Sequence, residues 1–215
     1  MHPVLVLPLN EGSGDIVYDR SGYNNHGTCY NTQWIKKWRD WLLYFNGENA
    51  YVNRPTVSGL NRSALTFAFW SKQLGTKDFF MHPLGLFGGH RATIYVAPNT
   101  FRYWYKFSNI DGVRYEGFIA TLDSEWHFIA VTFNGEQIKC YIDGVLEKTI
   151  DAVGSITGGD ESLFIGNTGT GSSPARNWFY GFIADVLVLR KVLSDEQIAF
   201  LSSLFRGEKR SPPVF

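Results

Sequence analysis

The sequence predicts an all-β domain with one short helix near its C-terminus. The chain of 215 residues contains 22 glycines, which separate many short runs rich in β-branched and aromatic residues. Several of these runs alternate apolar and polar residues with a period of two, the pattern of a half-buried strand. After residue 193 the apolar period becomes that of a helix.

The expected strands follow one another along most of the chain. They lie at residues 4–9, 41–47, 50–53, 64–70, 100–109, 112–120, 126–133, 137–144, 162–167 and 179–190. The run 126–133 is apolar on both faces, which predicts a central, covered strand. We expect the glycine-rich residues 84–90 to form a bend and residues 168–178 to form a long loop.

Two hairpins and the helix have local signals of their own. The turn sequence Asn-Ile-Asp-Gly at 109–112 and the pair Asn-Gly at 134–135 each predict a hairpin. Ser194 and Gln197 have the spacing of a capping box, so a helix should begin there. Its apolar stripe is expected to comprise Ile198, Leu201, Leu204 and Phe205.

Composition excludes some classes of function. Lys+Arg and Asp+Glu both number 20, so the formal net charge is zero and no basic surplus favours nucleic acid. No apolar stretch approaches the length of a membrane span, and the first ten residues lack the features of a signal peptide. Cys140 alternates with isoleucines and should be a buried thiol. The alternative is a single long-range disulfide between Cys140 and Cys29.

Four stretches, in order, resemble the laminin-G-like branch of the concanavalin A-like lectin/glucanase superfamily. They are LNEGSGDIVYDRSGYNNHGT, LYFNGENAYV, EWHFIAVTFNGEQIKCYIDG and YGFIADVLVLRKVLSDEQI. The resemblance implies an antiparallel β-sandwich, a concanavalin A-like jelly roll with one short C-terminal helix. It implies a single domain over residues 1–205, a tail over 206–215, and core positions for Trp70 and Trp126.

Catalysis is not expected from this sequence. Glucanases of the superfamily resemble one another in a strand with Glu-x-Asp-x-x-Glu, which supplies two close carboxylates. The chain has no such run, no Gly-x-Ser-x-Gly elbow and no histidine pair at a metal-ligand spacing. We expect His127 to satisfy backbone groups at the head of its strand. A glucanase-like hydrolase or lyase is therefore the weakest of three alternatives.

Many relatives in this superfamily hold a calcium ion, which prefers carboxylate and carbonyl oxygens. The residues that could supply ligands here are Asp19, Asn24 and Asp185, and Asn25 of the same loop could add another oxygen. Two departures remove charge, because Asn46 and Ala184 stand where relatives often have Asp. The alternative is that polar side chains of the opening turn hydrogen-bond to its backbone.

A carbohydrate site would need exposed aromatic rings surrounded by polar groups. In the strand 100–109, Arg102, Trp104 and Lys106 should share the outward face, near Arg114 of the next strand. Sugar stacking on Trp104 is one interpretation. The other is that the cations cover aromatic faces or pair across strands.

Further tryptophans extend the list of candidates. Trp34, Trp38 and Trp41 are interleaved with charged residues, and we expect Trp34 and Trp41 to serve packing. Trp38 and Trp178 are retained as ligand-binding candidates, the latter because it follows a long loop at the rim.

The sequence thus predicts a non-catalytic recognition or adhesion module that binds carbohydrate on a surface. The alternative is a virion structural component, a capsid decoration, surface or tail protein that uses the jelly roll for assembly. The expected partners are a glycan or glycosylated surface, or other virion or cell-surface proteins, with no nucleic acid and no membrane insertion. The expected location is extracellular or on a virion surface.

Overall fold

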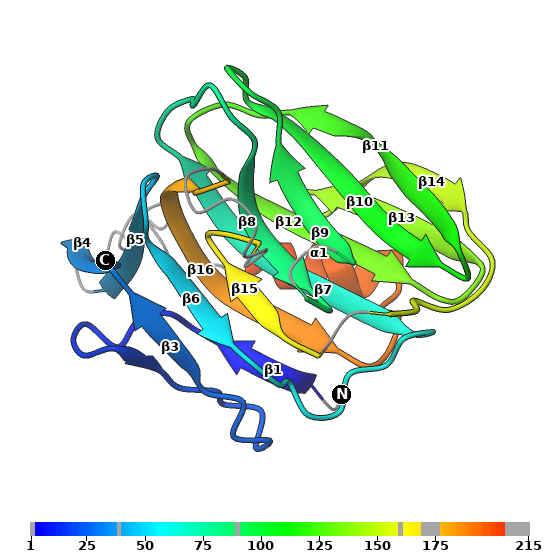
Figure 1. The fold of residues 1–215 in the computed structure, drawn as a ribbon, viewed down its shortest axis with the longest axis horizontal. Coiled ribbons are helices and arrows are strands. Elements are labelled where there is room, and N and C mark those ends of the chain that lie inside the picture. The colour runs from blue at the N-terminus through cyan, green and yellow to red at the C-terminus, as the bar shows by residue number, and fades with distance from the viewer. Residues whose placement is uncertain (1–2, 38–39, 89–90, 159–160, 169–176, 205–215) are drawn as a thin grey trace, which may run out of the picture.

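Two antiparallel sheets pack face to face in the computed structural model, as the sequence predicts (Figure 1). The structure describes residues 3–37, 40–88, 91–158, 161–168 and 177–204. The predicted tail over 206–215 and most of the expected loop over 168–178 lie outside these residues. No helix among the described residues is long and apolar enough to cross a membrane.

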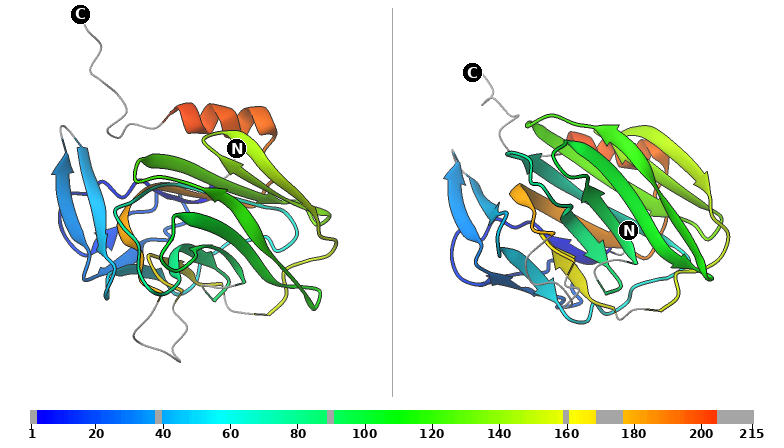
Figure 2. Two further views of the ribbon diagram at one scale, coloured as in Figure 1. Left: turned by 90° about the horizontal axis from the view of Figure 1, so that it is seen from above. Right: turned by 45° about the horizontal axis from the view of Figure 1, so that its top comes forward.

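Sheet A has the strand order β14-β13-β12-β7-β16-β5-β4, and β1 pairs with the second half of β16. Its strands are β1 (Pro3–Leu7), β4 (Gln33–Lys37), β5 (Asp40–Asn46), β7 (Leu65–Gln73), β12 (Trp126–Phe133), β13 (Gln137–Ile142), β14 (Val145–Asp151) and β16 (Tyr180–Leu189). Helix α1 (Asp195–Ser203) lies against the outer face of this sheet (Figure 2).

Sheet B has the order β11-β10-β9-β8-β15-β6-β3-β2 and lies in front in Figure 1. Its strands are β2 (Ile16–Val17), β3 (Gly27–Tyr30), β6 (Tyr51–Arg54), β8 (Met81–Leu86), β9 (Ala92–Val96), β10 (Arg102–Ile110), β11 (Val113–Thr121) and β15 (Leu163–Ile165). No helix of the described chain covers its outer face, whereas α1 covers part of the outer face of sheet A.

Apolar side chains from both sheets fill the space between them. Phe67 and Phe69 from sheet A meet Tyr103 and Phe107 from sheet B in one continuous core. This arrangement follows from the period of two, which directs alternate residues of each strand inward. A second cluster lies on the other face of sheet A.

The second cluster lies between sheet A and helix α1. Trp70 and Trp126 belong to it, at 5% and 1% exposure, together with Ile198 of the helix. The core prediction for both tryptophans is confirmed. The capping box of Ser194 and Gln197 is also confirmed. The expected helical stripe is partly wrong, because the helix ends before Leu204, which is exposed.

Both predicted hairpins are present. β10 and β11 turn at Asp111 and Gly112, whose φ angles of 43° and 88° fit the two central residues of a tight turn. Cys140 is fully buried, and both cysteines are free thiols. Cys29 is half-buried on β3.

The bend expected at 84–90 is wrong over its first half. Leu84–Leu86 completes β8, which is buried along its whole length and pairs with β9 and β15 on its two sides. Pairing on both edges overrides the loop preference of the glycine within it. With β8, six strands of the structure were not expected from the sequence; the other five are β2, β3, β4, β9 and β14.

Candidate functional site

The outer face of sheet B contains a cluster of aromatic rings centred on Trp104 of β10. Trp104 is half-buried and lies parallel to Tyr95 of β9, with ring centroids 6.1 Å apart. Phe118 of β11 meets it edge-on at 6.0 Å, and Phe80 meets Tyr95 edge-on at 5.5 Å. Phe118 and Phe80 are 38% and 46% exposed, so apolar ring surface is open to solvent here.

This cluster arises from the strand alternation that the sequence shows. Tyr103 and Tyr105 point into the core, and Trp104 between them therefore points outward. The pairing of Trp104 with both Tyr95 and Phe118 then brings three rings from neighbouring strands together. The predicted outward position of Trp104 is consistent with this arrangement.

Charged groups surround the rings. Glu116 of β11 accepts a hydrogen bond of 2.5 Å from the Tyr95 hydroxyl and forms an ion pair with Arg114. Burial raises the pKa of Glu116, but the hydrogen bonds from Tyr95 and Arg114 and the charges of Arg114 and Lys106 hold it below its ordinary value. The carboxylate is thus ionised at neutral pH and orders the polar edge of the cluster.

Lys106 and Arg102 flank Trp104 along β10. Burial and repulsion by Arg114 lower the pKa of Lys106, although Glu116 opposes this shift. Arg102 is exposed at the start of the strand. The structure therefore brings the four predicted residues of β10 and β11 to one face, with Lys106 and Arg114 near the Glu116 carboxylate and Arg102 farther along β10.

A second aromatic group lies on the same outer face at the other end of sheet B. Tyr30 of β3 stacks on Tyr51 of β6 with centroids 4.6 Å apart and an interplanar angle of 11°. Trp178 approaches Tyr51 at 5.7 Å, and Tyr30 is 43% exposed. Trp178 was a candidate from the sequence, but neither tyrosine was. The pairing of the two tyrosines depends on β3, a strand that was not expected from the sequence.

The tryptophans of the β4–β5 hairpin serve packing where the structure describes them. Trp34 donates its indole N–H to the carbonyl of Gly14 at 2.9 Å. A Cβ atom on Gly12 would lie only 2.6 Å from the nearest atoms of the Trp41 ring, so the ring packs directly against this glycine. Both rings therefore hold the glycine turn at 12–14. Trp38 lies outside the described residues.

The opening turn is organised by Asp19, which is 7% exposed. Its Oδ1 accepts the backbone N–H groups of Val6 and Ser21, each at 2.9 Å. Its Oδ2 accepts the Ser21 hydroxyl at 2.6 Å and the backbone N–H of Asn25 at 2.9 Å. Burial raises the Asp19 pKa, but these hydrogen bonds outweigh it and leave the pKa below its ordinary value.

Asn25, which the sequence suggests only as a possible calcium ligand, is the second organiser of the turn. It is fully buried and donates to the carbonyls of Val4 and Ser58, while its own oxygen accepts the Ser58 N–H. The neighbouring Asn24 is exposed, with a φ angle of 57°. Asn24 supplies a backbone conformation, and Asn25 supplies the cross-links.

The predicted calcium ligands do not fit an ion site in this arrangement. Both oxygens of Asp19 are already occupied by N–H and O–H donors, which leaves little room for a cation beside them. Asp185 is exposed at a bulge of β16, with a φ angle of 48°, and its N–H donates to Pro8. No group of three or more His, Cys, Asp or Glu residues in the described chain could hold a metal.

His127 at the head of β12 is held between two carboxylates. Its Nδ1 lies 2.8 Å from Asp143, and its Nε2 lies 2.9 Å from Asp123. The Asp143 hydrogen bond raises the His127 pKa above its ordinary value, burial opposes this, and Asp123 adds to the rise. Backbone partners were expected for His127, but its two ring nitrogens face carboxylates, and it is Asp143 that accepts a backbone N–H, that of Phe128.

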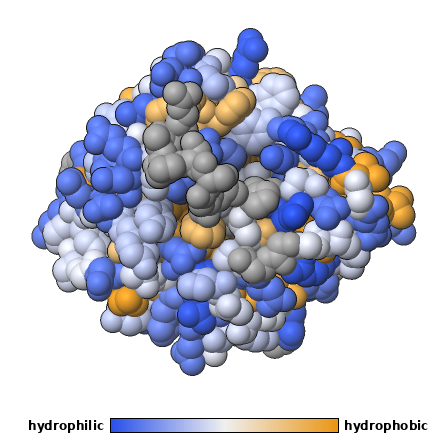
Figure 3. Space-filling model, viewed as in Figure 1, coloured by the Kyte–Doolittle hydropathy of each residue, from blue (hydrophilic) through white to orange (hydrophobic). Residues whose placement is uncertain are grey.

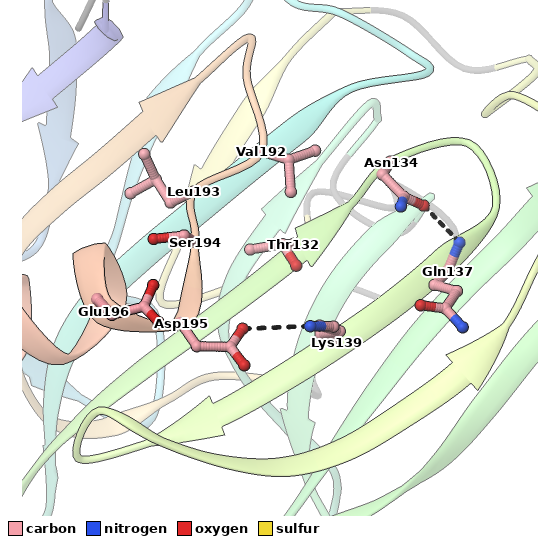
Figure 4. A pocket seen from close by; sticks show the side chains of 9 residues that line it. All are labelled: Thr132, Asn134, Gln137, Lys139, Val192, Leu193, Ser194, Asp195 and Glu196. Carbon is pink, nitrogen blue, oxygen red and sulfur yellow. Dashed lines mark hydrogen bonds and ion pairs between the residues drawn. The ribbon is translucent and has the colours of Figure 1, made fainter.

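A groove of about 460 Å³ lies on the opposite side of the molecule, between β12, β13 and the start of α1 (Figure 4). Asp195 and Lys139 face one another across it at 3.2 Å, and the Tyr141 hydroxyl also donates to Asp195. The charges of Lys139 and Asp195 therefore compensate one another, and no aromatic residue is among those that line the groove.

The outer face of sheet B is thus the stronger candidate for recognition. Figure 3 shows this side of the molecule as a mosaic of polar and intermediate surfaces with separate apolar patches. Polar groups beside open aromatic rings are what a ligand with both hydroxyl and C–H surfaces requires. The comparisons with known proteins agree with the fold that presents this face.

Solved structures with the same fold include the binding domain of botulinum neurotoxin DC in complex with rat synaptotagmin II. It is 16% identical, with a TM-score of 0.71, over 94% of this chain and 51% of that one. The botulinum neurotoxin serotype D ligand binding domain in complex with N-acetylneuraminic acid is 14% identical, with a TM-score of 0.74 over 94% and 50%. The binding domain of Paraclostridial Mosquitocidal Protein 1 is 14% identical, with a TM-score of 0.73 over 94% of this chain and 52% of that one.

The chain spans about half the length of these structures. No sequence among curated proteins matches it. A sequence model of the Laminin_G_3 family, described as the concanavalin A-like lectin/glucanases superfamily, matches residues 46–199, more than half of the chain. The protein therefore belongs to the concanavalin A-like lectin/glucanase superfamily.

Proposed function

We propose that this protein is a non-catalytic recognition module that binds carbohydrate on a surface. The observation that supports it is the half-buried Trp104 ring, which is stacked on Tyr95 and lies between Arg102 and Lys106 on the outward face of β10. The setting is extracellular or on a virion surface, and the partner is a glycan or a glycosylated protein.

The physical argument rests on the two kinds of surface that a sugar presents. The C–H face of a pyranose ring is apolar and can cover an indole ring, which removes apolar area from water. Hydroxyl and carboxylate oxygens at the ring edge accept hydrogen bonds from guanidinium and ammonium groups. Trp104 offers the first kind of contact, and its cationic neighbours on β10 and β11 offer the second.

The structural neighbours support the same class of function. One is in complex with N-acetylneuraminic acid, and another was studied for cell entry through interaction with two ganglioside molecules. A third is in complex with a protein, rat synaptotagmin II. These ligands belong to chains about twice as long, so their sites are not transferred to residues of this chain.

Replacing Trp104 by Ala tests the proposal. Binding to a glycan array should be lost, whereas Phe200→Ala should leave it unchanged, because Phe200 is an exposed ring on α1 behind the other sheet. Trp104→Ala also removes two ring contacts worth roughly 0.5–1.5 kcal/mol each. Circular dichroism at the assay temperature must therefore show that the variant is folded.

The array also separates the alternatives. Absence of binding by the intact protein, with and without calcium, would refute the carbohydrate proposal. A defined oligomer in light scattering together with that result would favour the virion structural alternative. Turnover of β-glucans would overturn the non-enzymatic assignment.

A further inference from the structure

We propose that the two aromatic groups of sheet B are the ends of one continuous row, which binds a linear acidic glycan across the strands. This inference rests on the proposed carbohydrate function and names the kind of carbohydrate. The row runs through Phe118, Trp104, Tyr95, His82, Trp178, Tyr51 and Tyr30.

The first half of the row follows from strand pairing. Phe118, Trp104 and Tyr95 are directly paired residues of β11, β10 and β9. His82 of β8 stacks on Tyr95 with centroids 5.6 Å apart. It lies in the irregular segment of β8 that faces Tyr95, between the pairs Met81–Val96 and Leu84–Ile94. Four neighbouring strands therefore place rings at one level.

The second half continues at the same level. Gly166 follows β15, and its N–H donates to Pro83, so it lies beside the His82 segment of β8. The pair Ile165–Val52 makes Gly166 the neighbour of Tyr51, and Tyr51 pairs directly with Tyr30. The row thus reaches β3 without a change of level.

Trp178 supplies a ring between His82 and Tyr51, at the point where the residue next to β15 is Gly166 and carries no side chain. Asn177 accepts the N–H of His82 at 3.2 Å, and Phe179 donates to the carbonyl of Gly166 at 2.9 Å. Trp178 lies between these two anchors and contacts Tyr51. A segment far away in the sequence therefore connects the two halves of the row.

The length of the row determines the size of the ligand. From Trp104 on β10 to Tyr30 on β3 there are five strand spacings of about 4.8 Å, or roughly 24 Å in all. A single sugar ring covers only one indole or phenol ring. A ligand that uses both ends must therefore be a chain of several sugars that runs perpendicular to the strands.

Exposure divides the row into a floor and open rings. Tyr95 and His82 are only 6% and 9% exposed and form the floor. Phe80 meets Tyr95 edge-on and is 46% exposed, so it presents a ring above that floor. Phe118 and Tyr30, at opposite ends, are 38% and 43% exposed. Solvent-accessible ring surface is thus spread over the length of the row.

The charges give the row a direction. Arg102 and Lys106 lie two residues on either side of Trp104 on β10, and Arg114 forms an ion pair with Glu116, the residue of β11 that pairs with Lys106. At the other end, the row consists of the rings of Tyr30, Tyr51 and Trp178. A glycan with carboxylate or sulfate groups would place them at the cationic end and stack a neutral sugar at the tyrosine end.

The test compares linear oligosaccharides of graded length by isothermal titration calorimetry. Hyaluronan and α2,8-linked sialic acid fragments, from disaccharide to octasaccharide, supply the acidic series, and chitin fragments supply the neutral one. In at least one acidic series the affinity should rise about tenfold or more with length, the gain of one further ring contact. The affinity for that series should fall as salt is raised, because the cations near Trp104 are solvent-accessible.

Variants locate the gain in affinity. Tyr30→Ala should remove the length-dependent gain but leave disaccharide binding unchanged, whereas Trp104→Ala should weaken binding at every length. Phe200→Ala is the matched control and should bind as the intact protein does. Because Tyr30 is exposed, its truncation should leave the fold intact.

Three outcomes would overturn the inference. Equal affinity at all lengths, lost only in Trp104→Ala, would refute the row and leave the proposed carbohydrate function standing. Stronger binding of the chitin series than of both acidic series would refute the acidic assignment. Failure of all three series to bind, together with a silent glycan array, would refute the proposed function as well.

Discussion

The opening turn offers the sharpest test of how the sequence determines local structure. Replacing Asp19 by Asn keeps the shape of the side chain but turns one acceptor oxygen into an NH₂ donor. If the amide oxygen stays toward Val6, the NH₂ group faces the N–H of Asn25 and the hydroxyl of Ser21. The hydroxyl can rotate and donate to Val4 instead, but the Asn25 N–H has no such choice.

The expected loss follows from these partners. One buried N–H left without an acceptor costs about 1–3 kcal/mol. The remaining hydrogen bonds also become weaker, because their acceptor is a neutral amide instead of an ionised carboxylate. Together these effects should lower the free energy of unfolding by about 3 kcal/mol, a large share of the 5–15 kcal/mol typical of a domain. Asn24→Gly, one position from the cross-linking Asn25, should change it by roughly 0.5 kcal/mol or less.

Urea denaturation, followed by tryptophan fluorescence, measures both variants. The folded-state pKa of Asp19 is lowered, so its contribution is present above the unfolded value of about 3.9 and is lost as pH falls through the folded pKa. The difference between the intact protein and Asp19→Asn should therefore shrink below about pH 4. A loss under 0.5 kcal/mol at pH 7, or no such convergence, would show that the network does not stabilise the turn.

Other predictions concern the rest of the chain. Gly181→Ala should unfold or strongly destabilise the protein, since the Lys72 carbonyl oxygen stands where the new Cβ would be; normal stability would refute this. His127 has a raised pKa, so its contribution is complete below the unfolded value of about 6.5 and fades as pH rises through the folded one. The stability gap to His127→Gln should narrow accordingly in urea titrations at several pH values. Burial raises the pKa of Cys29 to about 11, so iodoacetamide should label it slowly at pH 7, which mass spectrometry can check. EDTA should not lower the melting temperature, and a fall that calcium reverses would revive the calcium prediction.

Alternation explains why much of the fold could be predicted. Strands such as β7, β10 and β12 are defined by their own side chains, because the period of two already separates the inward face from the outward one. β14 is exposed along nearly all of its length and lacks that signal, so it became visible only through its pairing with β13. β8 was expected to be a bend because of its glycine, but it is a fully buried strand that is paired with β15 on one side and with β9 on the other.

The candidate site was partly predictable on the same grounds. The outward direction of Trp104 follows from its own strand, whereas its contacts with Tyr95 and Phe118 depend on the pairing of separate strands. In the opening turn, composition alone could not distinguish Asn24 from Asn25. Only the approach of Val4 and Ser58 shows which of the two side chains is buried.

The aromatic row has a consequence for how the ligand can be found. Its rings come from segments between Tyr30 and Trp178, and they line up only when the complete sheet has formed. A glycan that touches both ends therefore binds the folded chain and not the unfolded one. At a concentration of one hundred times its dissociation constant, such a ligand would add about 2.7 kcal/mol to the free energy of unfolding. A library of unlabelled glycans could thus be screened by the rise in melting temperature alone.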